Sequence, residues 1–127
     1  MAHGDYTHIE IPADDPARAQ RFYEGAFGWS FGEYPGFEGY FGYTTPAGRD
    51  ALGGALGKRG EMAPERIRNY IAVDSVDATV SKVQELGGSI VIPKAEVPGM
   101  GWYAAVTDSE GNEIGLWQDT SGGAGAG

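Results

Sequence analysis

The sequence predicts an α+β domain of two tandem βαβββ units, with curved mixed sheets that enclose a cleft. Two segments, 6–11 and 68–73, have the same alternating apolar pattern of a strand with one buried face. A helix-start signal, an amphipathic stretch, a short strand and a hairpin-like segment follow each of them. Because the same order of elements occurs twice, we predict an internal duplication.

The first strand of the first unit contains apolar Ile9 and Ile11 alternating with polar His8 and Glu10. Side chains on a strand point alternately to opposite faces. If Ile9 and Ile11 are buried against the following helix, His8 and Glu10 must therefore point the other way, into the predicted cleft.

The matching strand of the second unit follows the same rule. Ile71 and Val73 take the buried positions, so Arg68 and Tyr70 are expected on the cleft side. We predict that the two first strands pair, with His8 and Tyr70 pointing into one cleft.

Two amphipathic helices are expected to cover the sheets. Asp15 before Pro16, and Ser75 or Asp74 before Val76, are typical N-terminal caps. Apolar residues then recur at helical spacing: Ala19, Phe22, Tyr23 and Ala26 in the first helix, and Val76, Val80, Val83 and Leu86 in the second. Glycines near 25–28 and at 87–88 are expected to end them.

The remaining segments complete both units. Further strands are predicted at 29–32 and 89–93, with hairpins over 40–52 and 102–118 and a loop near 58–65. We therefore expect one domain over 1–120, with units at about 5–57 and 66–118. The Gly/Ala-rich tail, 121–127, has the composition of a disordered segment.

Composition narrows the possible partners and location. The 127 residues carry a net charge of −9 and no long basic cluster, so nucleic acid is not an expected partner. No apolar run is long enough to cross a membrane, and the first residues lack the features of an export signal. Absence of cysteine fits a reducing compartment. We expect a cytoplasmic protein without a membrane partner.

Four stretches, in this order, resemble the vicinal-oxygen-chelate (VOC) superfamily of glyoxalases, bleomycin-resistance proteins and dioxygenases: HIEI at 8–11, RFYEGAFGW at 21–29, LGG at 86–88 and DSEGNEIGL at 108–116. The resemblance covers about residues 6–118 and is closest to the branch related to lactoylglutathione lyase. It implies the VOC, or glyoxalase, fold and a small-molecule ligand in the cleft.

In metal-dependent members of that superfamily, four side chains, usually two His and two Glu, hold a divalent ion that chelates two substrate oxygens. The resemblance places those positions at His8, Tyr70, Gly115 and about Gly53, with Leu52 and Gly54 as one-residue alternatives. Only His8 is a competent ligand, so we expect no cofactor and no metal site of the usual kind. A site rebuilt from His8, Glu10 and Glu113 is the disfavoured alternative.

His8 and Glu10 are the candidate catalytic residues. His8 has an imidazole suited to proton transfer near neutral pH, and its alternative role is that of a buried, hydrogen-bonded histidine. Glu10 is a candidate general base, and its alternative role is an ion pair with Arg68. Both alternatives stay open at this point.

The candidate ligand-binding residues come from the second unit: Arg68, Tyr70, Trp102, Tyr103 and Trp117. Their aromatic rings are suited to stacking on a flat or apolar ligand, and each ring is also suited to core packing. The segment 98–102 is either a lid over the ligand or an ordinary surface turn.

Two functions that use a ligand in the cleft are compatible with these residues, and a regulatory or accessory domain with an empty cleft is a third possibility. The first is a glyoxalase-like lyase or isomerase that binds a small organic molecule and lacks most of the usual metal ligands. The second is a drug- or metabolite-sequestering protein of the bleomycin-resistance type. Superfamily members commonly complete the cleft wall with a second chain, so a homodimer is expected.

Overall fold

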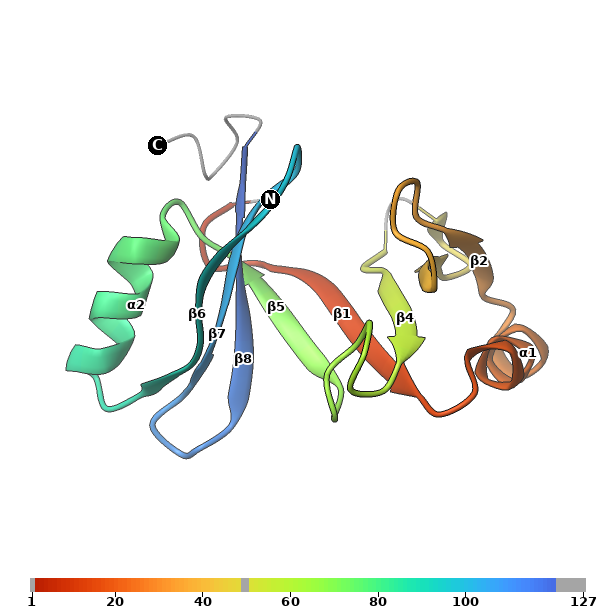
Figure 1. The fold of residues 1–127 in the computed structure, drawn as a ribbon, viewed down its shortest axis with the longest axis horizontal. Helices are drawn as coiled ribbons and strands as arrows, with labels where there is room; N and C mark the ends of the chain where they lie inside the picture. Colours follow the sequence, from red (N-terminus) through yellow and green to blue (C-terminus); the bar gives the residue numbers. More distant parts are fainter. Residues whose placement is uncertain (1, 49–50, 121–127) are drawn as a thin grey trace. The chain divides into compact units, whose positions relative to one another are not determined.

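The computed structural model describes residues 2–48 and 51–120, which form two compact units (Figure 1). The N-terminal unit comprises residues 8–68, and the C-terminal unit comprises residues 2–7 and 69–120. The predicted tail, 121–127, lies outside the described residues. Among the described residues, no helix has the length and apolar character needed to cross a membrane.

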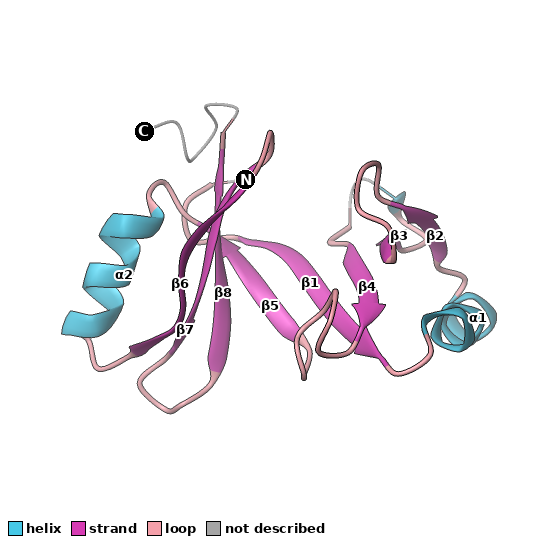
Figure 2. Cartoon of the chain, in the orientation of Figure 1, coloured by secondary structure: helices cyan, strands magenta, loops and turns pink. Residues whose placement is uncertain are grey.

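The N-terminal unit has the predicted βαβββ order (Figure 2). Its elements are β1 (Tyr6–Ala13, whose first two residues belong to the C-terminal unit), α1 (Pro16–Phe27), β2 (Ser30–Glu33), β3 (Tyr40–Thr44) and β4 (Gly54–Lys58). The strands lie in the order β2-β3-β4-β1. Strands β1 and β4 are parallel and the other neighbours are antiparallel, so the sheet is mixed.

The C-terminal unit repeats this arrangement. Its elements are β5 (Arg68–Ala72), α2 (Val76–Glu85), β6 (Ser89–Val97), β7 (Gly101–Thr107) and β8 (Glu113–Asp119). The strand order is β5-β8-β7-β6, and again only the first and last strands of the unit pair in parallel. The predicted α+β fold of two βαβββ units is therefore confirmed.

Both helices begin at the predicted caps. The Asp15 carboxylate accepts a hydrogen bond from the backbone N–H of Arg18 at 3.1 Å, and the Ser75 hydroxyl accepts one from Ala78 at 3.1 Å. These bonds satisfy amides that have no partner inside the helix. Helix α1 ends at Gly28, which has a φ of 72° that a side chain would disfavour.

The core of the N-terminal unit lies between its sheet and α1. The buried residues are Ile11, Ala13, Tyr43 and Leu56, against which Ile9, Ala19, Tyr23, Trp29 and Phe31 pack. An aromatic stack runs through this core. Trp29 is stacked between Tyr43 and Tyr23, with ring centroids 4.5 and 4.7 Å away. Ile9 and Ile11 therefore face α1, as predicted.

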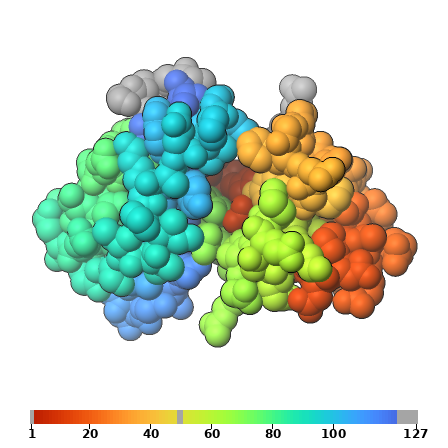
Figure 3. Space-filling model, viewed as in Figure 1, coloured from red at the N-terminus to blue at the C-terminus, as the bar shows by residue number. Residues whose placement is uncertain are grey.

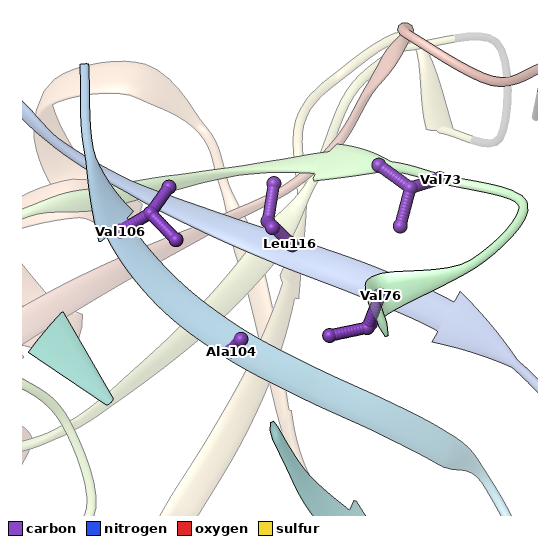
Figure 4. Packing of buried hydrophobic residues seen from close by; sticks show 5 residues of the cluster. All are labelled: Val73, Val76, Ala104, Val106 and Leu116. Atoms are coloured by element: carbon purple, nitrogen blue, oxygen red, sulfur yellow. The ribbon is translucent and has the colours of Figure 1, made fainter. Parts of the chain in front are cut away.

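The C-terminal unit has an equivalent core beneath α2, formed by Val73, Val76, Ala104, Val106 and Leu116 (Figure 4). Ile71, Val80 and Val83 pack against it. The predicted register of β5 is therefore confirmed. Three residues assigned to the helical stripes do not follow the prediction, because Ala26 is exposed and Phe22 and Leu86 are 60% and 71% exposed.

Strand β4 lies later in the chain than predicted. It spans residues 54–58, whereas the predicted hairpin ended at residue 52. Gly54 is the first residue of β4, which pairs with both β1 and β3. A Cβ at Gly54 would overlap the backbone of Ile9 on β1, so the close approach of these two strands requires glycine.

Replacing Leu56 with alanine should lower the free energy of unfolding by about 2–5 kcal/mol, because the side chain is fully buried in the N-terminal core. Urea denaturation measures this change. Leu86→Ala is the matched control, since Leu86 is largely exposed, and we expect it to change stability by no more than about 0.5 kcal/mol. Equal effects of the two substitutions would contradict this description of the core.

Candidate functional site

The polar residues of β1 share one sheet face of the N-terminal unit with residues of β3. Glu10 pairs with Ala55 of β4, which in turn pairs with Gly42 of β3. Paired residues on neighbouring strands point to the same side, and residues two apart on a strand do so as well. His8, Glu10 and Tyr40 therefore lie on the face opposite α1.

These three side chains form a hydrogen-bonded chain, which we call the His8–Tyr40–Glu10 cluster. The hydroxyl of Tyr40 donates to the Glu10 carboxylate, and Nε2 of His8 lies 3.1 Å from the same hydroxyl oxygen. All three are partly buried. An imidazole, a hydroxyl and a carboxylate linked in this order by hydrogen bonds can move a proton from one end to the other.

Burial favours the neutral form of the His8 imidazole. Burial lowers the pKa of its imidazole from the ordinary value of 6.5, and the nearby Glu10 carboxylate opposes that shift only in part. The side chain can therefore accept a proton from a ligand at neutral pH.

Tyr34 lies next to the cluster. Its ring centroid is 5.2 Å from that of Tyr40, and it covers Gly42, where an added Cβ would come within 3.0 Å of the ring. Burial raises the pKa of the Tyr34 hydroxyl, and the Glu10 carboxylate raises it further. The Tyr34 hydroxyl is thus a neutral hydrogen-bond donor beside the cluster.

A shallow depression of about 340 Å³ extends from Tyr34 along β2 and β3. It is lined by Ser30, Phe31, Gly32, Glu33, Tyr34, Pro35, Gly42 and Thr44. The space above Gly32 is empty, since an added Cβ there would meet no atom within 4 Å. The segment around residues 30–36, orange in Figure 3, lies on the surface of this unit. Tyr34 therefore lines the depression and also contacts the His8–Tyr40–Glu10 cluster.

The predicted ligand-binding residues belong mainly to the C-terminal unit. Tyr103 pairs with Trp117 across β7 and β8, on the face opposite α2, and the Trp117 indole N–H donates to Asp119 at 2.7 Å. Tyr70 and Arg68 are buried. The structure thus brings Tyr103 and Trp117 together on one sheet face.

Trp102 lies on the other face. It packs against the core beneath α2, and the Lys94 ammonium is 5.3 Å from the centroid of its ring. Adjacent residues on a strand point to opposite sides, so Trp102 and Tyr103 cannot line the same surface. Trp102 contributes to packing at this position.

The superfamily metal positions do not fit a metal ion here. Gly115 pairs with Tyr70, and a side chain at 115 would overlap the Tyr70 ring. A Cβ at Gly53 would lie 2.6 Å from the carbonyl oxygen of Tyr43. No room therefore exists for a carboxylate at either position. Within residues 2–48 and 51–120, no group of three or more His, Asp or Glu side chains could hold a metal ion.

Tyr40 and Tyr34 are site residues that the sequence did not reveal. Tyr40 lies in a segment predicted only as part of a hairpin, and no prediction covered the segment that contains Tyr34. The pairing of β3 with β4, and of β4 with β1, was needed to connect Tyr40 to His8.

Comparison with known proteins identifies relatives of this fold. The sequence model of the Glyoxalase/Bleomycin resistance protein/Dioxygenase superfamily matches residues 6–116. The chain is 33% identical over 121 residues to the Mycobacterium bovis protein named "Putative glyoxylase CFP32", covering 91% of this chain and 46% of the relative. The chain therefore spans about half the length of that relative.

Solved structures show the same fold. A glyoxalase/bleomycin resistance protein/dioxygenase superfamily member from Vibrio splendidus 12B01 aligns with a TM-score of 0.62 and 15% identity, covering 88% of this chain and 96% of that one. Methylmalonyl-CoA epimerase from Mycobacterium tuberculosis aligns with a TM-score of 0.63 and 14% identity, covering 94% and 91%.

Protein purified without chelator should contain far less than one equivalent of zinc, nickel, iron or manganese. The reason is steric, because Gly53 and Gly115 have no space for the carboxylates that would complete the ligand set. Elemental analysis measures the content. About one equivalent that disappears in His8→Ala would show that other residues complete a metal site.

Stability should fall as the pH drops below about 6.5, and part of this fall should come from His8. Its pKa is lower in the folded protein than in the unfolded chain, so the unfolded chain takes up a proton that the folded protein excludes. Urea denaturation at about pH 7.5 and about pH 5.5 should show a smaller loss in His8→Gln than in the unmodified protein. An equal loss in both proteins would contradict the lowered pKa.

Proposed function

Because the chain belongs to the glyoxalase/bleomycin resistance protein/dioxygenase superfamily, we propose that it binds a small organic molecule and moves a proton on it through the His8–Tyr40–Glu10 cluster. The observation that carries this proposal is the hydrogen-bonded chain from His8 Nε2 through Tyr40 to Glu10. The reaction class is that of a lyase or isomerase, in which a proton leaves a carbon next to a carbonyl group.

The chain's own residues supply the parts that such a step needs. In this proposal the neutral imidazole of His8 accepts the proton, and the Glu10 carboxylate offers a negative charge two hydrogen bonds away, through Tyr40. The neutral hydroxyl of Tyr34 is positioned to donate to an oxygen that becomes negative on the substrate. None of these roles requires side chains at positions 53 and 115.

The depression along β2 and β3 is the proposed place for the body of the ligand. It adjoins Tyr34, so a ligand lying there has its reactive end beside the cluster.

Sequestration without catalysis is the second candidate function. The aromatic rings favour it, because Tyr34 and Phe31 line the depression and Tyr103 and Trp117 share a face in the C-terminal unit. Arg68, Tyr70, Tyr103 and Trp117 stay proposed ligand-binding residues. A shared cleft, a homodimer and a cytoplasmic location also stay proposals.

Proton transfer can be tested by hydrogen exchange in D₂O with carbon acids as probes. The two probes are methylmalonyl-CoA, named for the epimerases of the same fold, and the hemithioacetal of methylglyoxal and glutathione. We expect deuterium to enter the carbon next to the carbonyl group of a probe. The exchange rate should fall about 10²- to 10⁴-fold in Glu10→Gln, since the carboxylate at the end of the hydrogen-bonded chain, which takes up the proton relayed from His8, is lost.

Glu24→Gln is the matched control. Glu24 lies exposed on α1, which covers the opposite sheet face, so its loss should leave the exchange rate unchanged. Binding of a probe without exchange, detected by calorimetry, would support sequestration and contradict catalysis. Exchange at the same rate in Glu10→Gln would remove the cluster from the proposal.

A further inference from the structure

We propose that the depression along β2 and β3 selects a ligand with a planar ring, which lies on the backbone at Gly32 beside the ring of Tyr34. The inference rests on the proposed function, which it deepens by naming the class of ligand: a carbonyl compound that contains an aromatic ring. It follows from the missing side chains in the middle of the depression and from the groups at its two ends.

Two glycines remove the side chains from the middle of the depression. Gly32 of β2 and Gly42 of β3 are paired in the antiparallel ladder, so they share one sheet face. The backbone at Gly32 is exposed, and the space above it is empty. A glycine inside a strand allows a ligand to approach the backbone closely. The exposed backbone of a strand is nearly flat here, and a planar ring contacts such a surface over more of its area than a puckered ring does.

The ring of Tyr34 forms one end of this space. It reaches over Gly42, where an added Cβ would come within 3.0 Å of a ring carbon. The loop that contains Tyr34 is held closed by two hydrogen bonds. The Tyr34 backbone N–H donates to the carbonyl of Tyr40 at 2.9 Å, and the Glu33 carboxylate accepts from the backbone N–H of Gly39 at 3.0 Å. An aromatic ring held beside an empty surface favours a second ring, through offset or edge-to-face contact.

Two hydroxyl groups form the other end. Ser30 and Thr44 are paired across β2 and β3, and each lies two residues along its strand from a glycine of the pair. They therefore share the sheet face of Gly32, and both are exposed. Two residues of an antiparallel strand span about 6.8 Å, so these hydroxyls lie within reach of a substituent on a single ring above Gly32. Each hydroxyl can donate or accept a hydrogen bond, so the substituent expected there is polar.

Two ketones that differ only in the ring test this selection. Acetophenone and cyclohexyl methyl ketone have the same carbonyl and methyl groups, and only acetophenone has a planar ring. In titrations followed by amide NMR, acetophenone should shift the signals of Gly32 and Gly42 and bind at least about threefold more tightly, because contact between aromatic rings adds to apolar burial. Equal binding of the two ketones, or no shift of either glycine signal, would overturn the inference.

Gly32→Val blocks the proposed site without disturbing the fold. Gly32 has no positive φ, the added side chain meets open space, and valine suits a strand, so stability should not fall. The shift that acetophenone causes at Gly42 should disappear. Gly25→Val is the matched control, because Gly25 lies on α1, also without a positive φ and with open space around it, and acetophenone binding should be unchanged. Undiminished binding in Gly32→Val would place the ring elsewhere and contradict the inference.

These titrations measure binding alone, so their outcome is separate from that of the exchange assay. Selective binding of acetophenone in a protein that exchanges no proton would keep the ring site and remove catalysis. Exchange in the unmodified protein with equal binding of both ketones would keep the proton transfer and remove the ring site.

Discussion

Burial of every second residue of β1 against α1 is the constraint on which the candidate site depends. Ile9 and Ile11 pack into the N-terminal core, and the pleat of the strand then fixes His8 and Glu10 on the opposite face. The pleat alone is sufficient to place these two polar side chains on that face. The apolar contacts that stabilise the unit also set the positions of its candidate catalytic residues.

The same constraint explains which parts of the structure the sequence could predict. Strand alternation and helix capping are local properties, so the faces of β1 and β5 and the caps at Asp15 and Ser75 could be predicted. Grouping Trp102 with Tyr103 went against the same rule, and the structure separates the two rings.

Tyr40 could not be found by local reasoning. Its role depends on the register between β3 and β4 and between β4 and β1, which arises only when distant segments pair. The predicted hairpin also ended at residue 52, whereas β4 begins at Gly54, where the structure needs close contact between strands. The backbone of Ile9 on the neighbouring strand requires glycine at this position, and only the tertiary structure reveals that contact.

The aromatic stack in the N-terminal core has a spectroscopic consequence. Trp29 is the single tryptophan of that unit, whereas Trp102 and Trp117 belong to the C-terminal unit. It lies between Tyr43 and Tyr23, and burial raises the pKa of the Tyr43 hydroxyl to about 12. Tyr43 therefore stays a phenol through mild alkali, and its hydroxyl continues to donate to the carbonyl of Ile9 at 3.2 Å. With the other two indoles replaced, the fluorescence of Trp29 would follow the opening of one unit alone.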